Sequence, residues 1–205
     1  RTAKYRLDHD AALKEKVNAI LKEAGHPYEY QGTSEITHFL WVLDEHPEVL
    51  DGKITDALKG TQVACYYGCH ILRPAPVMNH ESGDYPESFE RLVRRLGAEP
   101  VWFDAGRKCC GFHAQFTAEH DVLTVTGQIA ASADRAGANL IATPCPLCQM
   151  QLDMYGPEGR EAVHSQTDMP VLHLQQLIGL ALGMTKDEIG FNRHVSAREK
   201  LKIGG

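Results

Sequence analysis

The sequence has 205 residues, of which 43% are hydrophobic and 23% charged, and its net charge is −6. This mild acidity argues against nucleic acid as a main partner, because phosphate binding requires a basic face. No apolar run approaches the roughly 20 residues that span a bilayer, and no signal peptide is visible. The chain begins with Arg1 rather than Met, so we expect a processed product or part of a longer chain.

The first 58 residues are predicted to form a helical segment and a linker. Residues 8–25 place one apolar stripe on a helix that ends at Gly25, and we expect this stripe to be core, with a subunit contact as the alternative. The stripe consists of Leu13, Val17, Ile20, Leu21 and Ala24. A second helix is expected from Ser34, and residues 46–60 are expected to form a connection with a short helix.

From Thr61 onward, short apolar strands alternate with helices. The predicted strands are "TQVACYYG", "EPVWFD", "NLIATPC" and "MPVLHL", and helical patterns lie between and after them. This alternation predicts an α/β fold with a small parallel-type sheet and flanking helices. We therefore divide the chain into a helical segment, 1–58, and a cysteine-rich domain, 59–205.

The six cysteines fall into three groups, each at the end of a predicted strand or the start of a helix: Cys65 and Cys69, Cys109 and Cys110, Cys145 and Cys148. A secreted disulfide framework is disfavoured, because a chain of this size does not need disulfide bonds to be stable and has no secretion signal. We expect a cytoplasmic protein. The carboxyl ends of parallel strands share one edge, so all of these thiols except Cys65 are expected to converge there. Cys65 is expected to be a small buried hydrophobe.

Three kinds of chemistry fit these thiols. A structural zinc ion takes four ligands, often from CxxC pairs, but leaves the adjacent pair "CC" unexplained. A thioredoxin-like use of "CPLC" at a helix start leaves the same pair idle. An iron–sulfur cluster takes several thiolates at such an edge, and more than four would suit an unusual cluster.

The motifs "CYYGCHILRP", "LGAEPVWFD", "CCGFH", "TPCPLC" and "VLHLQQLIGLALG" resemble the cysteine-rich CCG domain found in the B-type subunit of heterodisulfide reductase. The resemblance covers the carboxyl-terminal two-thirds of that family. It implies a CCG fold and a noncubane [4Fe-4S] cluster bound by five cysteines. Matched position by position, the implied ligands are Cys69, Cys109, Cys110, Cys145 and Cys148.

The resemblance also implies disulfide/thiol redox chemistry, on the coenzyme B–coenzyme M heterodisulfide or a related disulfide, within a complex that has iron–sulfur and flavin subunits. The family's full subunit carries a further CCG domain, so cleavage by two clusters requires another segment or a partner. Where the family has a glycine-rich stretch after the adjacent pair, this chain has "GFHAQFT", which puts the identity of the disulfide in question.

Two other functions stay open at this point. One is a CCG subunit of a non-classical succinate dehydrogenase or fumarate reductase that exchanges electrons with a quinone or thiol. The other is a zinc-stabilised interaction module without redox activity. Metal analysis and co-purification with a flavoprotein would separate these alternatives.

Several side chains near the predicted ligands have more than one plausible role. His70 and His113 are candidate proton donors to a leaving thiolate, with a hydrogen bond to cluster sulfur or backbone as the plainer alternative. Arg73 is expected either to bind an anionic substrate group or to offset the cluster's negative charge. Tyr66 and Tyr67 are expected to pack at the strand end rather than line a cleft.

Overall fold

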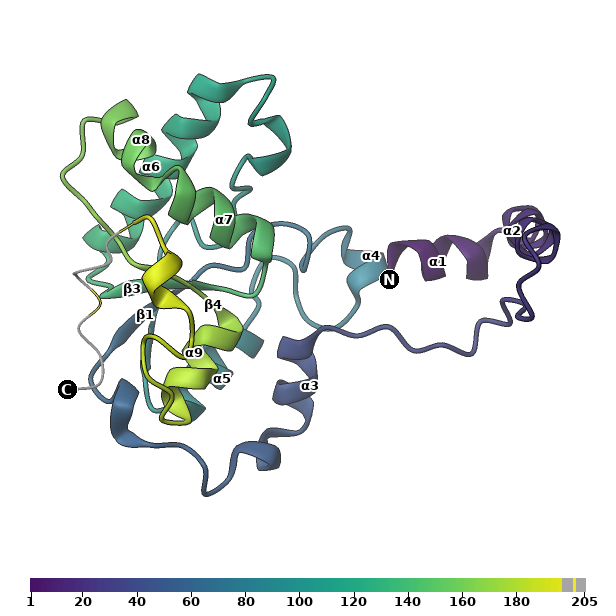
Figure 1. The fold of residues 1–205 in the computed structure, drawn as a ribbon, viewed down its shortest axis with the longest axis horizontal. Helices are drawn as coiled ribbons and strands as arrows, with labels where there is room; N and C mark the ends of the chain where they lie inside the picture. Colours follow the sequence, from purple (N-terminus) through teal and green to yellow (C-terminus); the bar gives the residue numbers. More distant parts are fainter. Residues whose placement is uncertain (197–200, 202–205) are drawn as a thin grey trace.

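In the computed structural model, which describes residues 1–196 and Leu201, four parallel strands form one sheet (Figure 1). In chain order they are β1 (Gln62–Cys65), β2 (Glu99–Val101), β3 (Leu140–Thr143) and β4 (Val171–His173), and their order in the sheet is β2-β1-β3-β4. Ala64 of β1 pairs with Val101 on one side and Ile141 on the other. The predicted α/β fold with a parallel sheet is confirmed.

Helices cover both faces of this sheet, which is why all four residues of β3 are buried. One face carries α3 (Phe39–Glu45), α5 (Ser88–Arg95) and α9 (Leu174–Ala181), with the short turns η1 (Pro47–Leu50) and η2 (Asp56–Leu58). The other carries α6 (Glu119–Arg135) and α7 (Pro146–Met154), and α8 (Gly156–Ala162) packs on α6. Two further turns are η3 (Phe112–Ala114) and η4 (Phe191–Arg193).

Alternation along β1 assigns its side chains to opposite faces. Val63 and Cys65 pack among the side chains on the α5 and α9 side. Ala64 and Tyr66 pack on the α6 and α7 side. The two-residue period of a strand therefore separates Cys65 from its neighbour Tyr66.

Helix α8 is absent from the sequence-based prediction, because its opening "GP" is typical of a turn. Its close packing depends on two glycines. A Cβ on Gly127 of α6 would come within 2.1 Å of the Gly159 carbonyl oxygen of α8. The two backbones can approach this closely only without side chains at the contact.

The amino-terminal segment differs from the prediction in two ways. It forms two helices, α1 (Thr2–His9) and α2 (Ala11–Glu23), which break at Asp10, where the backbone is extended and the side chain accepts a hydrogen bond from Leu13 N–H at 2.9 Å. Neither helix, both lying in the described part of the chain, contributes a buried residue. The expectation that the apolar stripe of α2 is core is therefore wrong; Ile20, for example, is 55% exposed.

The reason is the connection that follows α2. No helix begins at Ser34: residues 31–38 form neither helix nor strand, and α3 starts at Phe39. As Figure 1 shows, this stretch carries α1 and α2 away from the sheet, and α1 lies against the short helix α4 (Ala75–Met78). By contrast, Leu40, Leu50 and Leu58 join the core beside the sheet. The division at residue 58 stays a prediction.

Across residues 1–196 and Leu201, no helix is both long enough and apolar enough to cross a bilayer.

Candidate metal centre

Five thiols from three separate segments of the chain meet at the carboxyl edge of the sheet. Cys69 follows β1, Cys109 and Cys110 follow β2, and Cys145 caps the start of α7, which contains Cys148. The sulfur atoms of Cys69 and Cys109 are 3.8 Å apart. The Cys148 thiol hydrogen-bonds with both Cys110 and Cys145. The structure therefore brings together all five cysteines that the sequence predicted to converge.

Glycines make this close approach possible. Gly68 lies between β1 and Cys69 with a φ of +71°, and a Cβ at this position would come within 2.9 Å of Cys148 Sγ. Gly111 has a φ of +83°, and its N–H lies 3.4 Å from Cys109 Sγ, to which it donates a hydrogen bond. Both positions need a left-handed backbone that other residues rarely adopt.

The five thiols differ in their tendency to ionise. Hydrogen bonds from the Cys148 thiol and from backbone N–H groups at the start of α7 lower the pKa of Cys145 to about 6. The Cys148 thiol likewise lowers the pKa of Cys110. The contacts of Cys148 with Cys110 and Cys145, together with burial, raise the pKa of Cys148; burial and the neighbouring Cys109 raise the pKa of Cys69. Two of the five sulfurs, Cys110 and Cys145, are thus favoured as thiolates, whereas Cys148 is favoured as a thiol.

Tyr66 and Tyr67 are packing residues, as expected. Both are almost completely buried. The Tyr66 hydroxyl donates to the Lys108 carbonyl at 2.7 Å, just before the adjacent cysteines, and burial and the nearby thiols raise its pKa. The Tyr67 hydroxyl donates to Glu90 at 2.5 Å and accepts from Phe89 N–H at 2.8 Å. Tyr66 therefore supports the loop that carries two of the thiols.

Cys65 lies apart from the other five. It is 3% exposed and packs on the opposite face of the sheet. Burial raises the pKa of its thiol well above the ordinary value. The expectation of a small buried hydrophobe is confirmed.

The two histidines near the ligands stack on each other. The rings of His70 and His113 are 5.2 Å apart at an interplanar angle of 21°. They connect the loop after β1 with the turn η3 that follows the adjacent cysteines. Arg73 makes a parallel link, because its guanidinium donates to the Arg107 carbonyl at 3.2 Å. The roles expected for these three side chains stay predictions.

A buried amide network behind the thiols was missed by the sequence analysis. Gln151 Nε2 donates to Gln115 Oε1 at 3.0 Å and to Thr126 Oγ1 at 3.1 Å. The network joins α7, the loop after η3 and α6. A glutamine one helical turn after Cys148, on its buried face, was the available signal.

A cavity of about 230 Å³ adjoins the thiols on the side of α3. It was also missed by the sequence analysis, because its walls come from segments that are far apart in the chain. The lining residues are Arg1, Ile36, Thr37, His38, Trp41, His70, Ile71, Met78, Pro144, Cys145 and Pro146. Cys145 is thus the thiol that faces both the cluster of sulfurs and the cavity.

The donor set suits a group with several soft metal ions. Five thiols in one connected group match the preference of iron–sulfur clusters for thiolate ligands. A single zinc ion requires sulfurs around one point. Within the described residues, no three or more side chains of His, Cys, Asp or Glu are arranged to hold a single ion.

Comparison with known proteins matches the cysteine-rich part of the chain. A cysteine-rich domain named CCG matches residues 63–153, which span all five converging thiols. The chain is 44% identical, over 97% of its length and 69% of the relative's, to the 8-methylmenaquinol:fumarate reductase membrane anchor subunit of Wolinella succinogenes. It is 34% identical, over 94% of its length and 64% of the relative's, to the B-type subunit of the ferredoxin/F(420)H(2)-dependent CoB-CoM heterodisulfide reductase of Methanosarcina acetivorans.

A solved structure shares the fold. A hypothetical protein from Helicobacter pylori superposes with a TM-score of 0.72 at 16% identity, over 95% of this chain and 35% of that one. At this identity the likeness concerns the fold alone. The chain spans about two thirds of the length of its curated relatives and about one third of this structural neighbour.

Proposed function

The chain belongs to the CCG cysteine-rich family that includes the B-type subunit of heterodisulfide reductase, and from that membership we propose that it is the iron–sulfur subunit of a quinol-linked oxidoreductase. Its curated relatives are subunits of reductases that are named for 8-methylmenaquinol, or for ferredoxin and F(420)H(2). We propose that this chain exchanges electrons between a quinol and the flavin and iron–sulfur subunits of its own complex.

The observation that carries the proposal is the convergence of five thiols beside an apolar cavity. Cys69, Cys109, Cys110, Cys145 and Cys148 would hold the noncubane [4Fe-4S] cluster. When bound, such a cluster takes up and passes on single electrons and offers iron to a sulfur ligand. The chain's own residues do the rest: Gly68 and Gly111 permit the close approach, and Tyr66 supports the loop after β2.

Quinol is preferred over a heterodisulfide because of the cavity wall. That wall is mainly apolar, with Ile36, Trp41, Ile71 and Met78, and among the described residues that line it Arg1 is the only arginine or lysine. The coenzyme B–coenzyme M heterodisulfide is anionic and calls for several basic partners. Oxidation of a quinol to a quinone releases two electrons and two protons, and His70, in the same wall, is placed to receive a proton on a ring nitrogen, with His113 stacked behind it.

Disulfide/thiol chemistry is the second candidate. Cys109 is exposed and Cys69 half-buried, so one side of the thiol group is open to a sulfur substrate. The expected cytoplasmic location belongs to the proposal as well, since it rests on thiols that stay reduced there.

The deciding experiment starts from anaerobically purified protein. About four irons and four sulfides per chain, with an EPR signal of the oxidised sample, are expected. Rapid mixing with a reduced naphthoquinol should then reduce the cluster, as followed by its visible absorbance, and Cys109→Ser should lose both iron and reduction. Colourless protein that binds one zinc after reconstitution would contradict the cluster. If the cluster is intact but is not reduced by quinol, and the protein reduces a heterodisulfide with reduced viologen as electron donor, the second candidate would be favoured.

A further inference from the structure

We propose that Gln151 is a positioning residue for the thiol group. Through its hydrogen bond to Gln115 it holds the loop of the adjacent cysteines against α7, and it thereby fixes the spacing between Cys110 and Cys148. The inference rests on the proposed function, because it explains how side chains that are not ligands keep the ligands of the cluster in place.

Two contacts join the loop of the adjacent cysteines to α7. The first lies between two predicted ligands, where the side chains of Cys110 and Cys148 hydrogen-bond with each other. The second is the amide contact, in which Gln151 Nε2 donates to Gln115 Oε1 at 3.0 Å. Gln115 ends the turn η3 that follows Cys110, and Gln151 lies one helical turn after Cys148. The two segments are therefore connected at two points on either side of η3.

The amide contact uses no sulfur. Cys110 and Cys148 give up their mutual hydrogen bond when both sulfurs ligate iron, since a ligating cysteine is a thiolate. The bond between Gln115 and Gln151 is compatible with iron binding, because neither side chain is a ligand. Together with the packing of η3 against α6 and α7, it keeps the loop and the helix at a fixed separation.

Thr126 fixes the direction of the Gln151 amide. Gln151 Nε2 also donates to Thr126 Oγ1 at 3.1 Å, and Thr126 is 1% exposed on α6. One amide group is thus bonded to two acceptors on two separate elements. The loop cannot slide along α7 without breaking one of these bonds, so the network defines one position of the loop.

Stability alone does not account for a glutamine at this position. Gln151 is 0% exposed, and its Oε1 has no hydrogen-bond partner among the described residues. A buried acceptor without a partner is unfavourable, and an apolar side chain of the same length would avoid this cost. Directed hydrogen bonds specify the arrangement of the surrounding elements more strictly than apolar packing does, which is what a ligand set requires.

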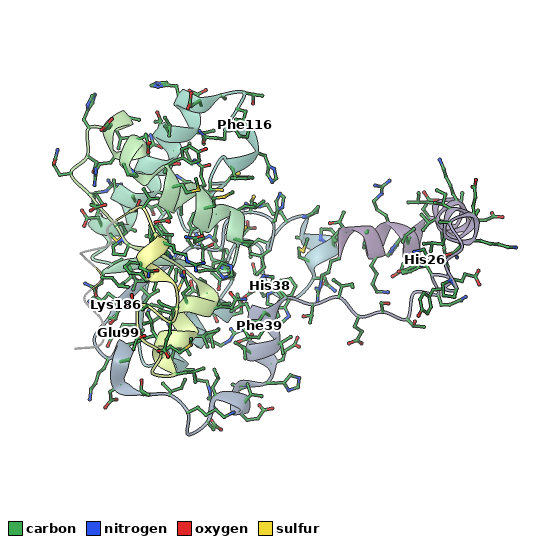
Figure 2. The ribbon with its side chains drawn as sticks, in the orientation of Figure 1. His26, His38, Phe39, Glu99, Phe116 and Lys186 are labelled. Carbon is green, nitrogen blue, oxygen red and sulfur yellow. The ribbon has the colours of Figure 1, made fainter. Side chains whose placement is uncertain are left out.

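Neighbouring side chains of the loop lie in opposite environments. Gln115 is 4% exposed, whereas Phe116, which Figure 2 labels, is 94% exposed. Phe116 therefore contributes little to the packing of the loop, and the Gln115 amide links this part of the loop to α7. Phe116 is also a control position on the same loop.

The first experiment measures the spacing without any metal. Its background keeps only Cys65, Cys110 and Cys148, and Cys65 is buried on the opposite face of the sheet. Diamide then oxidises the thiols of Cys110 and Cys148 to one disulfide and takes up the two electrons and two protons that they release. The rate of this reaction reports how well the loop and α7 are held together. The background contains three substitutions: Cys69→Ser, Cys109→Ser and Cys145→Ser.

In that background, Gln151→Met keeps the length of the side chain and removes its amide. The disulfide should form about 3- to 10-fold more slowly, the range of one lost hydrogen bond. Gln149→Met is the matched control, because Gln149 lies on the same helix beside Cys148 and takes no part in the network. Its rate should equal that of the background. Equal rates for the two variants would overturn the positioning role.

The second experiment uses the reconstituted chain with all its cysteines. Gln151→Met should transfer iron to a chelator, bathophenanthroline disulfonate, about 3- to 10-fold faster than wild type, and the EPR signal of the oxidised sample should broaden. Gln149→Met and Phe116→Ser should match wild type in both respects. If Gln151→Met lowers only the free energy of unfolding and leaves iron transfer and the EPR signal unchanged, its role is merely structural and the inference is overturned.

The outcomes separate this inference from the proposed function, because neither experiment uses quinol. Slower disulfide formation and faster iron loss in Gln151→Met, with a cluster that quinol does not reduce, would establish the positioning role and contradict the function. A cluster that quinol reduces, with Gln151→Met and Gln149→Met behaving alike, would overturn the positioning role and leave the function.

Discussion

A methyl group built on Gly68 would lie 2.9 Å from the sulfur of Cys148. This contact joins the turn after β1 to the first turn of α7, two segments that are distant in the chain but follow the neighbouring strands β1 and β3. There is no room for a side chain at position 68, because Cys148 Sγ occupies the space where its Cβ would lie. The same residue has a φ of +71°, which adds a backbone reason for glycine.

We therefore expect Gly68→Ala to reduce iron incorporation at least several-fold, because its Cβ would displace Cys148 Sγ. The matched control is Gly52→Ala, since Gly52 has a φ of +70° with no described atom within 4 Å of its added Cβ. Both variants should lose about 1–2 kcal/mol of unfolding free energy from the left-handed backbone. Iron and acid-labile sulfide analysis after anaerobic reconstitution distinguishes them; equal iron contents would contradict this role of Gly68.

Cys65 and Cys148 provide a second comparison, because both are buried and they lie on opposite faces of the sheet. Cys65→Ala should keep full iron content and lose about 1 kcal/mol of stability from the lost packing. Cys148→Ala should lose most of the iron. Iron content and chemical unfolding are the measurements, and loss of iron from the Cys65 variant would place that residue in the cluster site.

The amino-terminal helices should tolerate substitution that the core does not. Ile20→Glu on α2 should change the free energy of unfolding by no more than about 0.5 kcal/mol, as for other exposed sites. Leu40→Ala on α3, at a fully buried position, should lose about 2–5 kcal/mol. Urea unfolding of the two variants tests the assignment. A large loss for Ile20→Glu would mean that the stripe is buried in the folded chain.

Asp44 should make stability depend on pH at the acid end. Its carboxylate accepts two hydrogen bonds from Arg91, at 2.8 and 2.6 Å, and these together with His80 lower its pKa. The stabilisation is therefore complete above the ordinary carboxyl pKa of about 3.9 and is lost as the pH falls through the lower folded value. Because Arg91 is half exposed and solvent screens the pair, Asp44→Asn should lose only about 1 kcal/mol at pH 7.

The difference between wild type and Asp44→Asn in urea unfolding should shrink as the pH drops below about 4, the ordinary carboxyl range. Glu45→Gln is the matched control, since Glu45 is more exposed and faces His80; its unfolding free energy at pH 7 should match wild type. A constant difference across the pH range would show that Asp44 acts through packing rather than through charge.

The sheet and the thiol group follow from local patterns in the sequence. Alternation of strands and helices predicts parallel strands. Parallel strands place their carboxyl ends at one edge of the sheet, so cysteines that follow three of the strands are expected to meet at that edge. Burial of both faces by helices left β3 entirely apolar except for Thr143, which made the strand recognisable. These inferences use general rules of chain geometry, so no knowledge of the final packing was needed.

The surface that each amphipathic element faces was settled by tertiary packing instead. The stripe on α2 has the same pattern whether it meets the core, a partner or solvent. The connection 31–38, which forms neither helix nor strand, carries α2 away from the sheet and so leaves the stripe outside the core. Trp41 of α3 and Cys145 at the start of α7 line one cavity, although the two segments are distant in the chain. Periodicity reports the face that a residue occupies on its own element, whereas the partner of that face depends on how all the elements pack together.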